Sequence, residues 1–176
     1  MSRSDVISGH LHSSGYIVKD RARVKAFDIV GTSSAGIFEI WDTDVPPVTT
    51  GTYVRSTTTV TVTDTAHGLS TGDIIGISFE PDGGVIATCG NYEITVVDAD
   101  TFTLTDINSG TIANDPDCRY VKSNGDGINA QWKATWHTAA SDVFFNGFTI
   151  PSEGLLCRKG VYIYAVNLAS VNIYYA

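Results

Sequence analysis

Short runs of alternating apolar and polar residues, each ended by a turn signal, constrain the fold of this chain more than any other feature. Val60 and Val62 alternate with threonines. Trp132, Ala134 and Trp136 likewise alternate with polar residues. This period of two places alternate side chains on opposite faces of a strand. Thr, Val and Ile number 54, whereas Leu, Met, Glu, Lys and Gln number 17. Because β-branched residues lose rotamer freedom in helices but pack well on sheets, the chain is predicted to be all-β.

The charge of the chain is uneven and suggests two parts. The net charge is −8, and residues 47–125 hold ten acidic but only three basic residues, whereas the flanks are nearly neutral. Turn-forming residues bound this acidic segment at 44–47 and 123–127. Domains tolerate insertion at exposed loops. The sequence therefore predicts an acidic domain over residues 47–125, inserted into a host domain formed by residues 16–46 and 126–176.

The predicted host domain contains roughly seven short strands separated by turns. Residues 23–30 form the first. Val24 and Ala26 are assigned to one face of it. Phe27 and Ile29 are assigned to the other, and this change of phase predicts a β-bulge. Further strands are predicted at 37–41, 131–136, 144–150, 161–166 and 171–175. Such a pattern favours a β-sandwich or jelly-roll-like fold.

The predicted inserted domain repeats this pattern on a smaller scale. Its apolar rows are Val60/Val62, Ile75/Ile77/Phe79, Tyr92/Ile94/Val96 and Phe102/Leu104. About four to six strands of this length can close as a small β-barrel, which removes exposed sheet edges. The predicted fold class is therefore all-β, with a β-sandwich or jelly-roll-like host domain and a small β-barrel domain inserted in one loop.

The composition conflicts with several functional classes. Nucleic-acid binding through a basic face needs clustered Lys and Arg, which an acidic chain of this kind lacks. No apolar run approaches the length that spans a membrane, and residues 1–12 lack the apolar core of a signal peptide. Three cysteines without CxxC spacing favour neither a disulfide framework nor a zinc site. We expect synthesis in a reducing cytoplasm, with no cofactor.

Part of the predicted inserted domain resembles a known module. The matching segments are residues 59–63, 67–69, 72–77, 90–96 and 100–104. They are similar to a small β-barrel module that recurs in tailed-phage structural proteins and is named for its likeness to the first catalytic-cysteine half-domain of ubiquitin-activating enzymes. The resemblance implies a barrel fold and no enzymatic activity. Residues 85–89 are more apolar than the corresponding part of the usual module.

The flanking segments carry a second resemblance. The matching segments are residues 22–26, 34–36, 150–155, 160–163 and 169–175. They resemble a small β-sandwich protein of marine tailed phages, including cyanophage-like ones. The resemblance implies a virion structural protein, although the simpler family lacks the insert.

The four histidines are weak candidates for catalysis or metal binding. His10 and His12 lie two residues apart and could share a metal ion, but a solvated pair is favoured. For His67, which precedes a Gly-Leu turn, capping of a strand end is favoured over action as a general base. His137 has no evident acidic partner in the sequence. No metal ligand is therefore predicted.

Other catalytic motifs are missing from the sequence. Buried structural thiols are favoured over redox-active ones for Cys89 and Cys118. Neither a Gly-x-Ser-x-Gly elbow nor a glycine-rich phosphate loop occurs. Acidic pairs that could contribute to a calcium site, but lack the spacing of a calcium loop, are Asp98/Asp100, Asp115/Asp117 and Asn124/Asp126. The chain is therefore predicted not to be an enzyme, with no catalytic or cofactor-binding residues.

Aromatic residues are the main candidates for binding, since Tyr and Trp are enriched at protein contacts. The predicted interface residues are Tyr16, Trp41, Tyr162, Tyr164 and Tyr174. A sugar-stacking platform is the less favoured use of such aromatics. Residues 1–15 are polar and rich in Gly and Ser. They are predicted to form an N-terminal arm that either frays or orders on a neighbouring subunit.

Together these features predict a non-enzymatic phage virion structural protein. The favoured form is a capsid decoration (cement) protein that binds and stabilises the assembled head. Its partners would be the major capsid protein or other virion subunits, with a homo-oligomer or many copies multiplying a modest interface. Two alternatives stay open: a tail-associated hub, adaptor or fibre subunit, and a carbohydrate-binding adhesion module that takes a host-surface glycan. The expected location is the virion.

Overall fold

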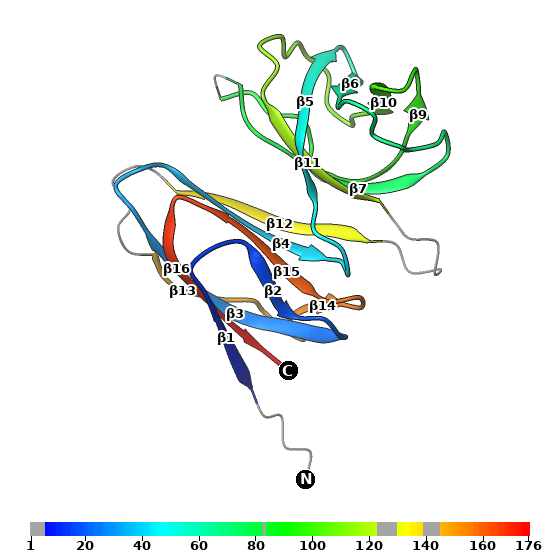
Figure 1. Ribbon diagram of the computed structural model, residues 1–176. Coiled ribbons are helices and arrows are strands. Elements are labelled where there is room, and N and C mark those ends of the chain that lie inside the picture. Colours follow the sequence, from blue (N-terminus) through cyan, green and yellow to red (C-terminus); the bar gives the residue numbers. More distant parts are fainter. Residues whose placement is uncertain (1–5, 83, 123–129, 139–144) are drawn as a thin grey trace. The chain divides into compact units, whose positions relative to one another are not determined.

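The computed structural model of this protein is built from β-strands. The structure describes residues 6–82, 84–122, 130–138 and 145–176. Within these ranges it contains sixteen strands and no helix (Figure 1). The predicted all-β class is confirmed. None of the described residues belongs to a helix able to cross a membrane.

The chain divides into two compact units. One, which we call the sandwich unit, comprises Met1–Pro46 and Lys133–Ala176, and the other, the barrel unit, comprises Pro47–Trp132. The first boundary falls where the charge pattern placed it, whereas the second lies seven residues later than predicted. The reason is that the strand returning the chain to the sandwich unit, β12, begins only at Gln131. Residues 123–129, where the second turn was predicted, lie outside the described ranges.

Two sheets form the sandwich unit. The strands of the first sheet are β1 (Ile7–Leu11), β3 (Ala22–Gly31), β13 (Phe145–Thr149), β14 (Leu155–Cys157) and β16 (Leu168–Tyr175). Those of the second are β2 (Gly15–Val18), β4 (Gly36–Asp42), β12 (Gln131–Thr138) and β15 (Val161–Val166). The strand orders are β1-β16-β3-β13, with β14 also on β3, and β12-β4-β15-β2.

One apolar core is shared by these two sheets. Its most deeply buried members are Val24, Phe27 and Ile29 of β3, Phe38 and Ile40 of β4, Val161 and Ile163 of β15, and Val171 and Ile173 of β16. The Trp136 ring lies 4.5 Å from that of Phe27, measured between centroids. The period-two alternation read from the sequence therefore does mark which side chains face the core.

A β-bulge interrupts β3, as the change of phase predicted. Tyr174 of β16 pairs with Ala26, whereas Tyr175 pairs with Val24, so Lys25 is the extra residue. The predicted assignment of faces is wrong, because Val24 lies in the same core as Phe27. An extra residue in one strand shifts the alternation by one position. Val24 lies before the bulge, and Phe27 and Ile29 lie after it. Because of the bulge, all three face the same core, although their positions differ in phase along the sequence.

The N-terminal segment is not a free arm. β1 pairs with β16 along its whole length, from Ile7 opposite Tyr175 to Leu11 opposite Val171. β2 pairs with β15, and Leu11 and Ile17 pack against the core. The predicted arm over residues 1–15 is therefore wrong for the strand residues in it, while residues 1–5 lie outside the described ranges. Backbone pairing with a strand distant in sequence outweighs the polar composition of this segment.

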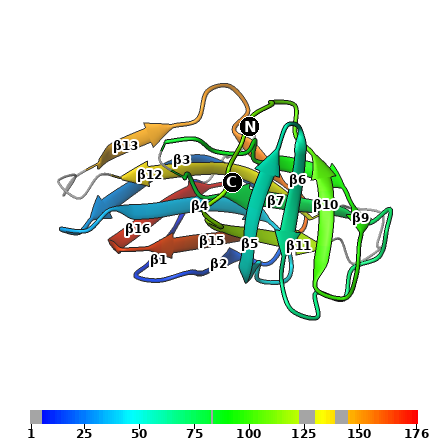
Figure 2. The same cartoon turned by 90° about the horizontal axis from the view of Figure 1, so that it is seen from above.

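The barrel unit is a single, nearly closed sheet. Its strands are β5 (Val48–Ser56), β6 (Thr59–Thr63), β7 (Ile74–Phe79), β8 (Gly90–Glu93), β9 (Thr95–Val96), β10 (Thr101–Thr105) and β11 (Asp117–Lys122). The order is β8-β7-β11-β5-β6-β10-β9, and Figure 2 shows β5, β6 and β10 side by side. Only Ile94 separates the two terminal strands, β8 and β9, so the chain itself joins the ends of the sheet. Ile75, Ile77 and Phe79, predicted as one apolar row, are all fully buried in its core.

The barrel unit occupies a connection between two neighbouring strands of the sandwich unit. β4 and β12 are adjacent in the second sheet. The N–H of Gly36, where β4 begins, donates to Oγ1 of Thr138, where β12 ends. At the other end Lys133 Nζ lies 3.6 Å from Asp42 Oδ2. The two strands therefore run in opposite directions. A short loop could connect such a pair, but here the barrel unit lies between them in the sequence.

Candidate functional site

The two N-terminal strands form one open side of the sandwich unit. β1 ends the first sheet and β2 ends the second, and both views show them side by side (Figures 1 and 2). A Cβ at Gly9 would lie 2.9 Å from the Ile17 side chain, so the two strands adjoin. Among the described residues, no strand pairs with the outer edge of β1 or β2. We call residues 6–18 the N-terminal edge.

The N-terminal edge lacks the usual protection of an exposed strand. Soluble proteins block such edges with charged side chains, proline or bulges. Residues 6–18 contain no Lys, Arg, Asp, Glu or Pro. Val6 and Ile7, at the start of β1, are 56% and 53% exposed. Unpaired backbone groups beside exposed apolar side chains suit the addition of a partner strand.

Two of the predicted interface residues meet at this edge. Tyr16 of β2 is paired with Tyr162 of β15, and their rings pack edge to face with centroids 5.0 Å apart. Lys19 Nζ lies 4.7 Å from the centroid of the Tyr16 ring. Both tyrosines are half-buried. Aromatic rings held in this way offer contact area to a partner, and their side chains lose little conformational entropy on binding.

The Tyr16 hydroxyl is a buried donor. Burial, together with the negative charge of Asp44, raises the pKa of Tyr16 to about 12. The hydroxyl therefore keeps its proton at neutral pH. Its oxygen is buried and has no hydrogen-bond partner in the described part of the chain. A buried polar group without a partner costs about 1–3 kcal/mol.

Trp41 is not available as an interface residue. Its side chain is 0% exposed, and its Nε1 donates to Glu39 Oε2 at 2.9 Å. Thr135 Oγ1 donates to the other oxygen of the same carboxylate at 3.3 Å. The prediction that Trp41 contacts a partner is therefore corrected. The polar end of the indole is satisfied by a buried carboxylate of its own strand, which allows complete burial.

The two remaining predicted interface residues do not form one patch with the others. Tyr174 lies on β16 in the first sheet, where its hydroxyl donates to Asp28 Oδ2 at 2.8 Å. That hydrogen bond and the charge of Asp28 raise the pKa of Tyr174. Tyr164 lies on β15, two positions after Tyr162, and is half-buried. Tyr162 thus pairs with Tyr16 on one side and with Trp41 on the other.

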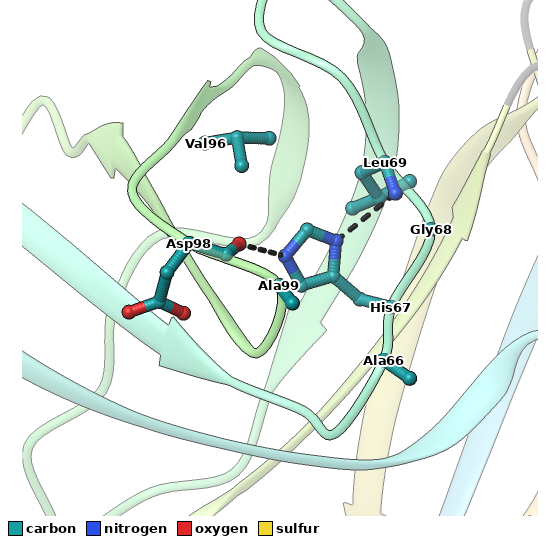
Figure 3. A pocket seen from close by; sticks show the side chains of 7 residues that line it. All are labelled: Ala66, His67, Gly68, Leu69, Val96, Asp98 and Ala99. Atoms are coloured by element: carbon teal, nitrogen blue, oxygen red, sulfur yellow. Dashed lines mark hydrogen bonds between the residues drawn. The ribbon is translucent and has the colours of Figure 1, made fainter.

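A shallow apolar pocket of about 380 Å³ lies in the barrel unit. Its lining residues are Ala66, His67, Gly68, Leu69, Val96, Asp98 and Ala99 (Figure 3). The His67 imidazole lies between two segments of the wall. Leu69 N–H donates to Nδ1 at 3.0 Å. Nε2 then carries the ring proton of the neutral form and donates to the Asp98 carbonyl at 3.1 Å.

These contacts give His67 a structural role. The ring packs edge to face on Phe102, with centroids 5.3 Å apart. Both nitrogens are engaged by backbone groups, so neither is available to accept a substrate proton. The sequence favours capping of a strand end by His67, but the ring instead bridges two loop segments, at Leu69 and at Asp98.

Cys89, Cys118 and Cys157 form no disulfide bond. Burial raises the pKa of Cys157 to about 12 and raises that of Cys118 as well. The Phe79 N–H donates to Cys89 Sγ at 3.3 Å. Because the thiolate is the reactive form, these environments suit packing rather than nucleophilic chemistry for the two buried thiols.

Asp98 and Asp100 serve as turn-forming groups, whereas Asp117 is the first residue of β11. Asp98 Oδ1 accepts from the Asp100 N–H at 2.9 Å, and Asp100 Oδ1 accepts from the Ala66 N–H at 2.8 Å. Asn124 and Asp126 lie outside the described ranges. Within those ranges no three His, Cys, Asp or Glu side chains gather as they would around a metal ion.

The fold and the N-terminal edge together define an all-β, two-unit protein with an open surface for strand pairing. Comparison with known proteins finds no family model, no curated protein and no solved structure that matches the chain. From the sequence, Tyr16 is predicted as an interface residue and residues 1–15 as an arm, but the two strand edges over residues 6–18 are not predicted, because much of this segment is polar. The signal that could have shown them is the alternation of Ile7, Gly9 and Leu11 with polar residues.

Proposed function

We propose that this protein is a non-enzymatic structural component of a tailed-phage virion, and specifically a capsid decoration protein. The observation that carries the proposal is the N-terminal edge, which presents two unpaired strand edges without a charged side chain. The resemblance of several sequence segments to phage structural proteins supports the virion as its setting. An adhesive role needs a binding surface and a stable scaffold, and no reactive group.

In this proposal a strand of a capsid subunit pairs with β1. Backbone hydrogen bonds supply affinity, while Val6 and Ile7 pack against apolar side chains of the partner. Binding only to the assembled shell shifts the assembly equilibrium toward that shell, and many symmetry-related copies add avidity. The excess of acidic residues in the barrel unit favours solubility of the decorated particle.

The first prediction tests the edge. In the full chain, V6K combined with I7K places two charges where a partner strand would pack. Binding to purified heads that lack the protein should fall by at least about tenfold, since desolvating two unpaired charges is costly. The measurement is occupancy by quantitative mass spectrometry of washed particles.

The matched control is V97K combined with I107K, which adds the same charge at apolar positions that are 61% and 80% exposed in the barrel unit. This variant should bind like the native protein. Equal occupancy by the edge variant and the control would contradict the proposal. Copy number in native particles separates the alternatives, because decoration gives many copies that follow the capsid lattice, whereas a tail subunit gives few.

A further inference from the structure

His10 and His12 face each other beside β16. His10 lies in β1 opposite Asn172, and His12 follows the last residue of that strand. Side chains two positions apart on a strand point to the same face, which here is opposite to that of Leu11. The two Nε2 atoms lie 3.1 Å apart, and the ring planes are 86° from parallel. Both side chains are exposed, so a small solute can reach them.

Each ring is held in place through its other nitrogen. His12 Nδ1 lies 2.9 Å from the Ala169 carbonyl oxygen, which can only accept, so Nδ1 carries the proton. His10 Nδ1 lies 2.6 Å from Asn172 Oδ1 and donates to it. A neutral imidazole protonated at Nδ1 keeps a lone pair on Nε2. When both rings are neutral, two lone pairs therefore meet at hydrogen-bond distance with no proton between them.

We infer that His10 and His12 bind a divalent transition-metal ion through these two Nε2 atoms. With metal–nitrogen bonds of about 2.0–2.1 Å, a 3.1 Å separation corresponds to an N–metal–N angle of about 100°, which suits tetrahedral and octahedral coordination. Histidine ligands commonly donate their second N–H to a carbonyl or a similar acceptor, which fixes the tautomer and the ring orientation. Both rings are already held in this way.

The class of ion follows from the donor set. Imidazole nitrogen suits Zn²⁺, Ni²⁺ and Cu²⁺, whereas Ca²⁺ and Mg²⁺ prefer oxygen. No third His, Cys, Asp or Glu joins the pair in the described ranges, so water completes the coordination. Asn172 and Ala169, which hold the rings, belong to β16. A bound ion would therefore fasten the end of β1 to its neighbour strand and stabilise the N-terminal edge.

Zinc titration of the chelator-treated full chain tests this inference. We expect one saturable site by calorimetry and a melting temperature that rises with Zn²⁺ and returns after EDTA, since binding to the folded state alone stabilises it. Ca²⁺ and Mg²⁺ at the same concentrations should leave the melting temperature unchanged. H10A and H12A should each abolish the site while keeping the native circular dichroism spectrum.

Two further variants sharpen the test. H137A removes an exposed histidine of β12 and should bind Zn²⁺ like the native chain. N172A keeps both histidine ligands but removes the group that positions His10, so it should weaken Zn²⁺ binding by about tenfold. This variant tests the site independently of whether H10A folds. Absence of a saturable site in the native chain would overturn the inference. Unchanged binding in H10A, H12A and N172A would overturn it equally.

Discussion

At the scale of single residues, the barrel unit depends on a buried ion pair. Arg55 Nη1 donates to Asp106 Oδ2 at 2.5 Å, with both side chains at most 4% exposed. The same carboxylate accepts from the backbone N–H of Thr88 at 3.2 Å and of Asn108 at 3.0 Å. Burial alone would raise the pKa of Asp106, but hydrogen bonds from Thr88, Asn108 and Arg55 outweigh it. The pKa therefore lies below its ordinary value of 3.8.

Replacing this carboxylate should produce a pH-dependent loss of stability. D106N leaves the Arg55 charge buried without a counterion, which costs about 3–5 kcal/mol at pH 7. A carboxyl group with a lowered folded-state pKa stabilises the protein above its unfolded pKa, and this contribution is lost as pH falls through the folded pKa. The stability difference from the native chain should therefore be constant down to about pH 5 and shrink below about pH 4.

Urea unfolding across this pH range measures the effect. D117N, at an exposed position of β11, is the matched control and should change stability by less than about 0.5 kcal/mol at pH 7. A D106N deficit of the same size at pH 3 and pH 7 would mean that the side chain acts through its shape and not through its charge.

At the scale of elements, turns with a left-handed backbone decide how strands connect. Residues 151–154 lie between β13 and β14. Ser152 and Gly154 have φ values of 59° and 79°. A Cβ at Gly154 would lie 2.5 Å from the Val24 carbonyl oxygen. Glycine is needed here for the backbone angle and also for the close approach of β3.

The two requirements can be separated by comparing two glycines. G154A should destabilise the chain by roughly 2–4 kcal/mol, of which about 1–2 kcal/mol is the left-handed backbone and the rest is steric overlap. Gly72 has φ of 90° with no atom within 4 Å of its added Cβ, so G72A should show the backbone cost alone. Urea unfolding measures both. Equal losses would show that β3 moves away from the new methyl group at no cost.

At the scale of the whole molecule, two separate cores share one chain. The barrel core and the sandwich core are distinct clusters with no residue in common. The chain leaves the sandwich unit after Pro46 and returns at Lys133. Since the entropy of closing a loop grows only slowly with its length, a large insertion at this point is compatible with a stable host.

Removing the barrel unit tests this independence. A chain in which a short Gly/Ser linker replaces residues 47–132 should still unfold cooperatively in urea, with the near-ultraviolet circular dichroism of packed aromatic residues such as Phe27 and Trp136. Residues 47–132 expressed alone should also unfold cooperatively. Loss of cooperative unfolding in both fragments would show that neither core is sufficient without the other.

Several features of the fold could be predicted because they depend on neighbouring residues. Val161 and Ile163 face the core as their alternation indicates, and the bulge at Lys25 follows from a local change of phase. The N-terminal edge could not be predicted in the same way. The pairing of β1 with β16 joins residues more than 150 positions apart, and the burial of Trp41 depends on the Glu39 carboxylate being buried beside it.

The sequence by itself determined that this protein is built from strands, and it determined which side chains are buried in most of them. The reason is that apolar and polar residues alternate with a period of two within each short segment. The tertiary structure alone decided which edges stay open and which polar groups meet. His10 comes to lie between His12 and Asn172, and Tyr16 lies against Tyr162, only because distant strands pair in one register. Register is a property of strand pairs, so no single segment encodes it.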